Sequence, residues 1–170
     1  MKPWLRKCIG LLSVVFLVLL DRVTKNWAVA ALRGKAAIGI IPGALELTYV
    51  ENRGMAFGLF QNRRWVFLVI TVVVLAVVLY LYLRMSTARR YLLMRVSLLL
   101  LAAGAVGNFI DRLIQSYVID FIYFSLIDFP VFNVADIYVT MSGFLIAFLV
   151  LFIFRDADFS VMLGRSRKNG

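Results

Sequence analysis

The sequence of 170 residues contains no histidine and a single cysteine, Cys8. A Ser-His-Asp triad needs histidine and an internal disulfide needs two cysteines, so neither can be built. The usual ligand sets of a zinc site are missing for the same reason. We therefore expect a protein that works without a metal or a cofactor.

Acidic residues are also scarce, with nine Asp and Glu against 19 Lys and Arg, which gives a formal net charge of +10. A positive charge of this size can indicate a nucleic-acid partner. Here the basic residues gather at the ends of apolar stretches and not along a polar face, so we expect no nucleic-acid binding.

Long apolar stretches take up much of the chain, and hydrophobic residues make up 63% of it. Three windows carry no charged side chain: Trp65–Leu83, Val96–Ile110 and Ile137–Phe154. About 20 apolar residues cross a hydrocarbon layer of about 30 Å. The windows therefore predict transmembrane helices over about 65–84, 91–111 and 135–154.

A fourth transmembrane helix is predicted over about 8–32. Its apolar first half is followed by Asp21 and Lys25, which stand four residues apart and can pair on one helix face. The start of the chain also has features of a secretory signal, with Ala28-Val-Ala30 as a cleavage site. We interpret it as an uncleaved helix, because charged residues separate the apolar stretch from those alanines.

The predicted fold is an all-α integral membrane protein with four transmembrane helices in a single domain, 1–170. Both termini are expected to be cytoplasmic, because this orientation places most of the basic residues on the cytoplasmic side. Those residues are Lys2, Arg6, Lys7, Arg84, Arg89, Arg90, Arg95, Arg155, Arg165, Arg167 and Lys168.

The first outer segment spans 34–64. Pro42-Gly43 marks a turn, and the alternation of apolar and polar residues in Ala44–Val50 predicts a strand. The stretch Asn52–Gly58 that follows is either an ordinary surface hairpin or a flap over a substrate. The local pattern favours the hairpin.

Four aspartates lie around the second outer segment: Asp111, Asp120, Asp128 and Asp136. Asp120 and Asp136 have apolar neighbours at a membrane boundary, where an ionised group is costly and often functional. If the chain brings them together, they share a proton and can activate a water against a peptide bond. The alternatives are a helix cap for Asp136, with Asn133 as the N-cap, and a salt bridge to Arg112 for Asp120.

Asn108, Asp111 and Arg112 lie at the outer end of the third predicted helix. Their spacing of i, i+3 and i+4 places them on one helix face. They form either a structural cluster that holds the following loop or a source of charge that biases the aspartate pair. The two roles are compatible.

Five motifs occur in order along the chain. They are Asp21-Arg-Val-Thr-Lys25, Asn52-Arg-Gly-Met-Ala-Phe-Gly58, Gly107-Asn-Phe-Ile-Asp-Arg112, Val118-Ile-Asp-Phe-Ile122 and Phe129-Pro-Val-Phe-Asn-Val-Ala-Asp136. Together with the four helices, they closely resemble the lipoprotein signal peptidase family, the bacterial type II signal peptidases. The resemblance implies an aspartic endopeptidase of the bacterial cytoplasmic (inner) membrane. Such an enzyme removes the signal peptide from diacylglyceryl-modified prolipoproteins by cleaving before the lipidated cysteine at the outer face.

Carried over by position, the resemblance implies that Asp120 and Asp136 are the catalytic pair, with Asp111, Asp21 and Lys25 as structural support. The residues that match the family's substrate site are Asn52, Gly54, Asn108, Arg112, Asn133 and Ala135. The resemblance also implies a small β-sheet cradle in the first outer segment, contact with membrane lipid, and a monomer.

Two positions depart from the family pattern. Ser116 stands where glycine is usual, and Ile137 follows Asp136 where a small residue is common. Both can alter the mobility of the loop between the aspartates without removing the chemistry. Asp128 falls within that loop and is not assigned to catalysis.

Two other functional classes remain as alternatives. A small transporter would carry its carboxylates at the middle of a helix, and the three uncharged windows have none there. A nonenzymatic membrane scaffold would not require the acidic cluster at the outer face.

Overall fold

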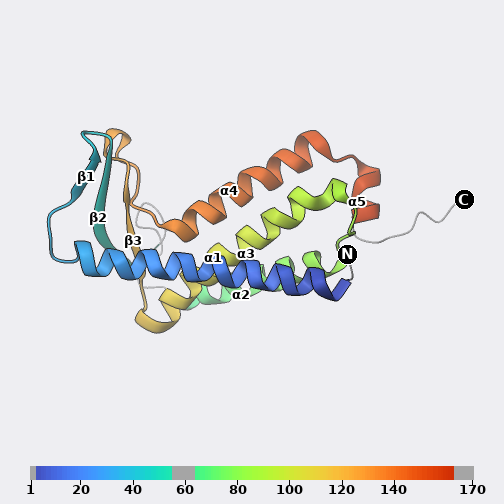
Figure 1. The fold of residues 1–170 in the computed structure, drawn as a ribbon, viewed down its shortest axis with the longest axis horizontal. Coiled ribbons are helices and arrows are strands. Elements are labelled where there is room, and N and C mark those ends of the chain that lie inside the picture. Colours follow the sequence, from blue (N-terminus) through green and yellow to red (C-terminus); the bar gives the residue numbers. More distant parts are fainter. Residues whose placement is uncertain (1–2, 55–63, 163–170) are drawn as a thin grey trace, which may run out of the picture.

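Helix α1 (Pro3–Leu32) runs the length of the molecule, and a three-stranded sheet lies across one end of it (Figure 1). The computed structural model describes residues 3–54 and 64–162. After α1 the described elements are β1 (Ile38–Ile41), β2 (Leu45–Asn52), α2 (Arg64–Arg84), a 3-10 turn (Arg89–Tyr91), α3 (Leu92–Gln115), β3 (Val118–Tyr123), a second 3-10 turn (Ser125–Ile127), α4 (Val134–Phe148), a π-helical turn (Leu149–Ile153) and α5 (Asp156–Met162).

The central helix of the bundle is α3, which packs against α1, α2 and α4. In Figure 1, α4 starts close to the sheet and departs from α1 toward the end that carries α5. The hydrophobic core at the α5 end includes Tyr82, Tyr91 and Leu98, and a second core joins α1 to the sheet through Ala28 and Phe121.

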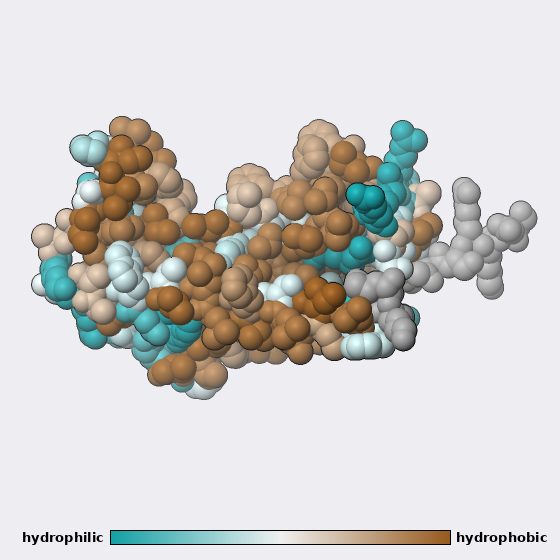
Figure 2. Space-filling model, viewed as in Figure 1, coloured by the Kyte–Doolittle hydropathy of each residue, from teal (hydrophilic) through white to brown (hydrophobic). Residues whose placement is uncertain are grey.

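Three helices of the described part are long and apolar enough to cross a membrane: Arg64–Arg84, Arg89–Gln115 and Val134–Ile153. Apolar side chains cover the middle of the helices, and polar ones gather toward the two ends of the molecule (Figure 2). Only helices and closed barrels satisfy all their backbone groups in lipid, so this exterior suits a bilayer. Helix α3 continues to Gln115 instead of ending near residue 111, which carries it further toward the sheet.

Helix α1 reverses the pattern of a soluble helix. The side chains of Leu11, Leu12 and Phe16 are each 66% exposed, whereas Asp21 and Lys25 are fully buried. An apolar exterior with a polar interior is stable when the surrounding solvent is hydrocarbon, because the helix backbone is internally hydrogen-bonded.

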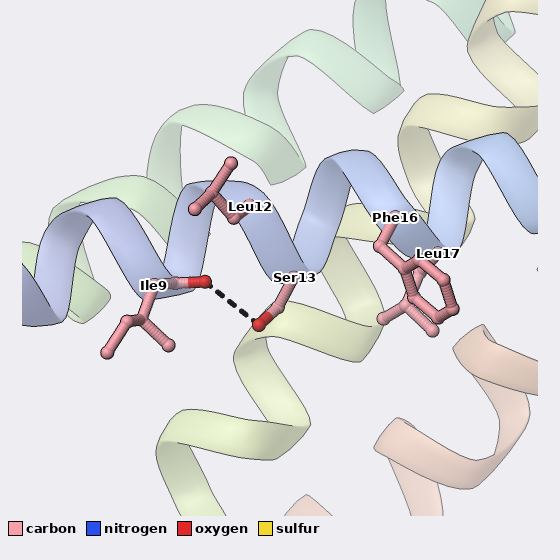
Figure 3. Close-up of a pocket in the computed structure, with 5 residues that line it drawn as sticks. All are labelled: Ile9, Leu12, Ser13, Phe16 and Leu17. Atoms are coloured by element: carbon pink, nitrogen blue, oxygen red, sulfur yellow. Dashed lines mark hydrogen bonds between the residues drawn. The ribbon is translucent and has the colours of Figure 1, made fainter.

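An open apolar groove follows the first half of α1 (Figure 3). It is lined by Ile9, Leu12, Ser13, Phe16 and Leu17. The Ser13 hydroxyl donates to the Ile9 carbonyl at 2.9 Å, so the one polar side chain of this set is already paired. Ser13 precedes Lys25 by about 18 Å along the helix. The groove is therefore apolar and separate from the polar residues described below.

The sheet is antiparallel with the strand order β1-β2-β3. The expected small sheet is present, and β1 and β2 come from the segment 34–64, but the third strand, β3, comes from the segment between α3 and α4. The β3 pairing places Asp120 opposite Val50 and Val118 opposite Asn52. The first four residues of β3 are buried, so this short strand gains both a hydrogen-bonding partner in β2 and an apolar contact with α1. Residues 55–63, which include most of the predicted hairpin or flap, lie outside the described residues.

Ser116 ends α3 in the left-handed conformation, with φ of 70°. Its amide donates to the Arg112 carbonyl at 3.2 Å, and its hydroxyl accepts a hydrogen bond from Arg64. Glycine is favoured at such a helix end because a side chain is strained there. The structure thus explains why glycine is usual at this position and what serine gains in its place.

Replacing Ser116 separates the effect of the left-handed backbone conformation from that of the hydrogen bond with Arg64. We expect Ser116→Ile to destabilise the fold by about 1–2 kcal/mol, because a β-branched residue is strained at positive φ. Ser116→Gly also loses the hydroxyl but suits the backbone, so its thermal unfolding temperature in detergent should stay close to that of the wild type. Equal losses in both variants would mean that the hydrogen bond from Arg64 dominates.

The close contact between α3 and α4 depends on Gly104. A Cβ atom there would lie 2.4 Å from the Ala135 carbonyl oxygen and 2.7 Å from Cγ2 of Val139. Small residues are the usual means by which membrane helices approach closely. Helices α3 and α4 are therefore tightly packed at this end of α3.

We predict that Gly104→Ala lowers the thermal unfolding temperature in detergent, with an overpacking cost of about 1–3 kcal/mol. The matched control is Gly143→Ala in α4, where an added Cβ meets nothing within 4 Å. That variant should unfold at or above the wild-type temperature, because alanine is the better helix former. An unchanged unfolding temperature for Gly104→Ala would contradict the packing argument.

Candidate active site

Asp120 lies in the middle of β3, where pairing with β2 brings it to the end of the helix bundle. Its side chain is 1% exposed. One carboxylate oxygen accepts a hydrogen bond from Asn133 Nδ2 at 2.6 Å, and the other accepts one from Asn52 Nδ2 at 2.8 Å. The predicted alternative of a salt bridge to Arg112 is wrong, since two amides fill these acceptor positions.

Asp136 lies in the first turn of α4. Asn133 is the N-cap, as predicted, because its side-chain oxygen accepts from the Asp136 amide at 3.0 Å. In return, Asp136 Oδ2 accepts from the Asn133 amide at 3.1 Å, which completes a capping box. The other carboxylate oxygen, Oδ1, accepts from Asn108 Nδ2 at 2.7 Å. Capping of α4 thus occupies Oδ2 of Asp136, and Oδ1 is left to contact Asn108 in α3.

Asn133 connects the two aspartates. Its side-chain amide reaches Asp120 while its backbone amide reaches Asp136, and the same Nδ2 also donates to Asn108 Oδ1 at 3.2 Å. The structure therefore brings Asp120 and Asp136 together. Each of the four carboxylate oxygens accepts one N–H, which holds both groups at fixed positions.

Burial and the neighbouring Asp136 carboxylate raise the pKa of Asp120 to about 7, although hydrogen bonds from Asn52 and Asn133 act in the opposite direction. Desolvation of the carboxylate is the larger cause. Two carboxyl groups that interact in this way titrate as a pair and share one proton near neutral pH. Such a pair contains both a general acid and a general base.

Lys25 is the centre of a buried ion cluster beneath the pair. Its ammonium lies 2.9 Å from Asp21 Oδ2 and 2.8 Å from Asp111 Oδ2, and all three side chains are fully buried. The predicted pairing of Asp21 with Lys25 is confirmed. Arg22 forms a further ion pair with Asp111, so α1 and α3 are joined by charges of both signs.

Arg112 projects from α3 toward the first outer segment. Its Nη2 donates to the Gly54 carbonyl at 3.2 Å, and its guanidinium lies 4.6 Å from the ring centre of Phe67. The Gly54 amide in turn donates to Asn52 Oδ1 at 3.0 Å. A chain of hydrogen bonds therefore links Arg112 through Gly54 to Asn52, which lies beside Asp120.

Ala135 is fully buried between α3 and α1. Its amide donates to Asp21 Oδ1 at 2.9 Å. Asp128, by contrast, is exposed and accepts a hydrogen bond from the Tyr123 hydroxyl at 2.6 Å. The structure thus places Ala135 at the base of the cluster and Asp128 outside it.

Sequence reasoning missed the ion pair of Arg22 and the position of Gly107 beside a buried carboxylate. Arg22 lies within the first motif, but its partner Asp111 is distant in sequence. A Cβ on Gly107 would lie 2.7 Å from Asp21 Oδ2, so the glycine makes room for the buried carboxylate. The proximity of Gly107 to Asn108 and Asp111 was the available signal.

Comparison with known proteins places this arrangement in a family. The sequence pattern of the family described as Signal peptidase (SPase) II matches residues 13–153. The lipoprotein signal peptidases of Streptococcus pyogenes serotype M5 (strain Manfredo) and serotype M18 (strain MGAS8232) are each 39% identical over 155 residues, covering 91% of this chain and 99% of theirs.

Solved structures are similar as well. A bacterial membrane enzyme determined by the in meso method at 2.3 Å resolution is 34% identical, with a TM-score of 0.74, and the match covers 95% of this chain and 94% of that one. A second such structure, at 1.9 Å resolution, has a TM-score of 0.75 with 34% identity, covering 86% and 94% of the two chains. On these grounds the chain belongs to the signal peptidase II family, the lipoprotein signal peptidases.

Proposed function

We propose that Asp120 and Asp136 are the catalytic pair of this lipoprotein signal peptidase. The enzyme removes signal peptides from prolipoproteins, and the bond that it cleaves lies before the lipidated cysteine of a diacylglyceryl-modified substrate. The observation that carries the proposal is the shared neighbour: Asn133 donates to both carboxylates, one from a strand and one from a helix. An aspartic mechanism needs two carboxyl groups held together in this way.

In the proposed resting state, Asp120 holds the shared proton and Asp136 is ionised. Asp136 lies at the positive end of the α4 dipole, which favours its ionised form. Asp136 takes a proton from a water whose oxygen bonds to the scissile carbonyl carbon, while Asp120 protonates the carbonyl oxygen. The C–N bond then breaks, the proton on Asp136 passes to the leaving nitrogen, and Asp120 recovers its proton from the tetrahedral intermediate.

The proposed substrate site surrounds this pair. Its residues are Asn52, Gly54, Asn108, Arg112, Asn133 and Ala135. Arg112 donates one N–H to the Gly54 carbonyl, and its guanidinium has further N–H groups that can donate to a substrate carbonyl. Ala135 contributes through packing, because it is fully buried and keeps the start of α4 against α3.

We place the enzyme in the bacterial cytoplasmic (inner) membrane as a multi-pass protein with four spans. α1 supplies the fourth span, since it has 30 residues and an apolar exterior and its buried charges are paired. Both termini are cytoplasmic, so the sheet and the aspartate pair face outward, where a lipid-anchored substrate presents its cleavage site.

The whole chain, 1–170, is proposed to be one membrane-embedded peptidase domain that works as a monomer. Membrane lipid is its second partner, because the helices expose many apolar side chains, and Figure 2 shows those on one face of the bundle. The lipid chains of the substrate approach through the same medium, so the domain needs no soluble substrate-binding module.

Neutralising either aspartate tests the assignment. We expect Asp120→Asn and Asp136→Asn each to reduce cleavage of a diacylglyceryl-modified prolipoprotein by about 10²–10⁴-fold, the usual contribution of general acid–base catalysis. The measurement is the cleavage rate of purified protein in detergent, with thermal unfolding as the check on folding. Asp128→Asn is the matched control and should keep full activity. A folded variant at position 120 or 136 that cleaves at the wild-type rate would remove that residue from the pair.

The pH dependence of cleavage follows from the shared proton. The pair is active with one proton, so the rate should fall above about pH 7, where the proton held by Asp120 is lost. At acid pH the rate should fall again as the second carboxylate is protonated. A pH–rate profile at saturating substrate measures both limbs, and unfolding temperatures across the same range exclude denaturation as the cause. A rate that still rises well above pH 8 would contradict the singly protonated state.

A further inference from the structure

The buried ammonium of Lys25 makes three contacts, and the third is with the catalytic region. Besides the two carboxylates, Nζ lies 3.0 Å from Asn108 Oδ1. An ammonium has three N–H donors and no acceptor. The ammonium therefore donates to Asn108 and forms ion pairs with Asp21 and Asp111, and the side chain is 0% exposed.

This contact fixes which way the Asn108 amide faces. Lys25 can only donate, so the amide oxygen must point toward it. The amide nitrogen then points the other way and donates to Asp136 Oδ1 at 2.7 Å. A turned amide would place its N–H groups against the ammonium and its oxygen against the Asp136 carboxylate, and both contacts would be repulsive.

The same oxygen of Asn108 also accepts from Asn133 Nδ2 at 3.2 Å, and this nitrogen donates to Asp120 as well. One buried cation on α1 thus supports the donors of both aspartates through side chains on α3 and at the start of α4. Lys25 itself forms no hydrogen bond with either Asp120 or Asp136 among those of the described residues.

We propose that Lys25 is a positioning residue for catalysis, because its ammonium holds the Asn108 amide in the orientation that donates to Asp136. This inference rests on the proposed function of the aspartate pair. It goes beyond a role for Lys25 in holding the helices together, because it assigns to that side chain an effect on the protonation of the pair.

The other charged groups around the pair are accounted for. Arg112 acts on both aspartates by its charge, but its hydrogen bond goes to Gly54. Asp21 and Asp111 are each paired with the Lys25 ammonium, and Arg22 pairs with Asp111. Of the described cations, Lys25 is therefore the one that bonds to an amide of the site.

The test is a double-mutant cycle in the pH–rate profile of kcat, with Lys25→Met, Asn108→Ala and the double variant. Loss of the N–H donor to Asp136 favours its protonated form, so each single variant should move both limbs to higher pH, by about one unit. The double variant should shift by less than the sum of the two single shifts, because both changes remove the bond from Asn108 to Asp136, whereas the direct effect of the Lys25 charge on Asp120 is lost only with Lys25. Additive shifts, or a lower kcat with unmoved limbs, would overturn the proposal.

Lys25→Met leaves the buried carboxylates of Asp21 and Asp111 with Arg22 as the one remaining cation of the cluster, and this can prevent folding. The comparison is therefore repeated in an Asp111→Asn background, where Lys25→Met leaves Asp21 and Arg22 with no net charge. The Asp111→Asn variant retains the bond from Lys25 to Asn108, so the further addition of Lys25→Met should again raise both limbs. A folded Asp111→Asn/Lys25→Met variant whose limbs match those of Asp111→Asn, or that has no activity at any pH, would refute a positioning role.

Arg95→Met is the matched control for the loss of a buried cation. Arg95 is 9% exposed in α3 and donates to the Ser86 and Ala88 carbonyls, far along the helix from Asn108. Its loss should lower the unfolding temperature and leave both limbs in place. If Asp120→Asn abolishes cleavage while the limbs of the Lys25 variants stay unmoved, the catalytic pair stands and only the inference about Lys25 fails.

Discussion

This structure depends on the ion pairs that the buried ammonium of Lys25 forms. Two carboxylates, Asp21 and Asp111, surround it, and Arg22 completes a cluster with no net charge. Removing an ion from water costs several kcal/mol, and that cost is offset only when every partner is present. Because Asp21 also accepts the Ala135 amide, the cluster joins α1, α3 and α4 at one point beneath the aspartate pair.

The surrounding solvent explains why a polar cluster has this role. Lipid chains are as apolar as leucine, so burying more leucine between membrane helices gains little. Close packing and hydrogen bonds must hold the bundle instead. Gly104 and Gly107 allow the helix backbones to approach, and the contact that they permit brings the Asp21 carboxylate within reach of α4. Small residues and buried charges therefore act together to hold the helices of the bundle in contact.

Much of the fold and the site could be predicted from the sequence, because local spacing and composition carry the necessary signal. The uncharged windows located α2, α3 and α4, and the four-residue spacing identified the pair Asp21 and Lys25. The third strand was missed, because a six-residue strand becomes stable only when a distant partner pairs with it. The contact of Asn133 with Asp120 and that of Arg22 with Asp111 were equally invisible, since each depends on residues brought together by tertiary packing.

The two aspartates belong to different mechanical units. Asp120 is held by the hydrogen-bond ladder of the sheet, whereas Asp136 is held by the first turn of α4. The carboxylate pair is therefore a joint between a sheet that lies across the bundle and the bundle itself (Figure 1). A tilt of the sheet changes the separation of the two carboxylates, and with it their coupling. The separation of the two carboxylates consequently depends on how tightly the sheet packs against the helices.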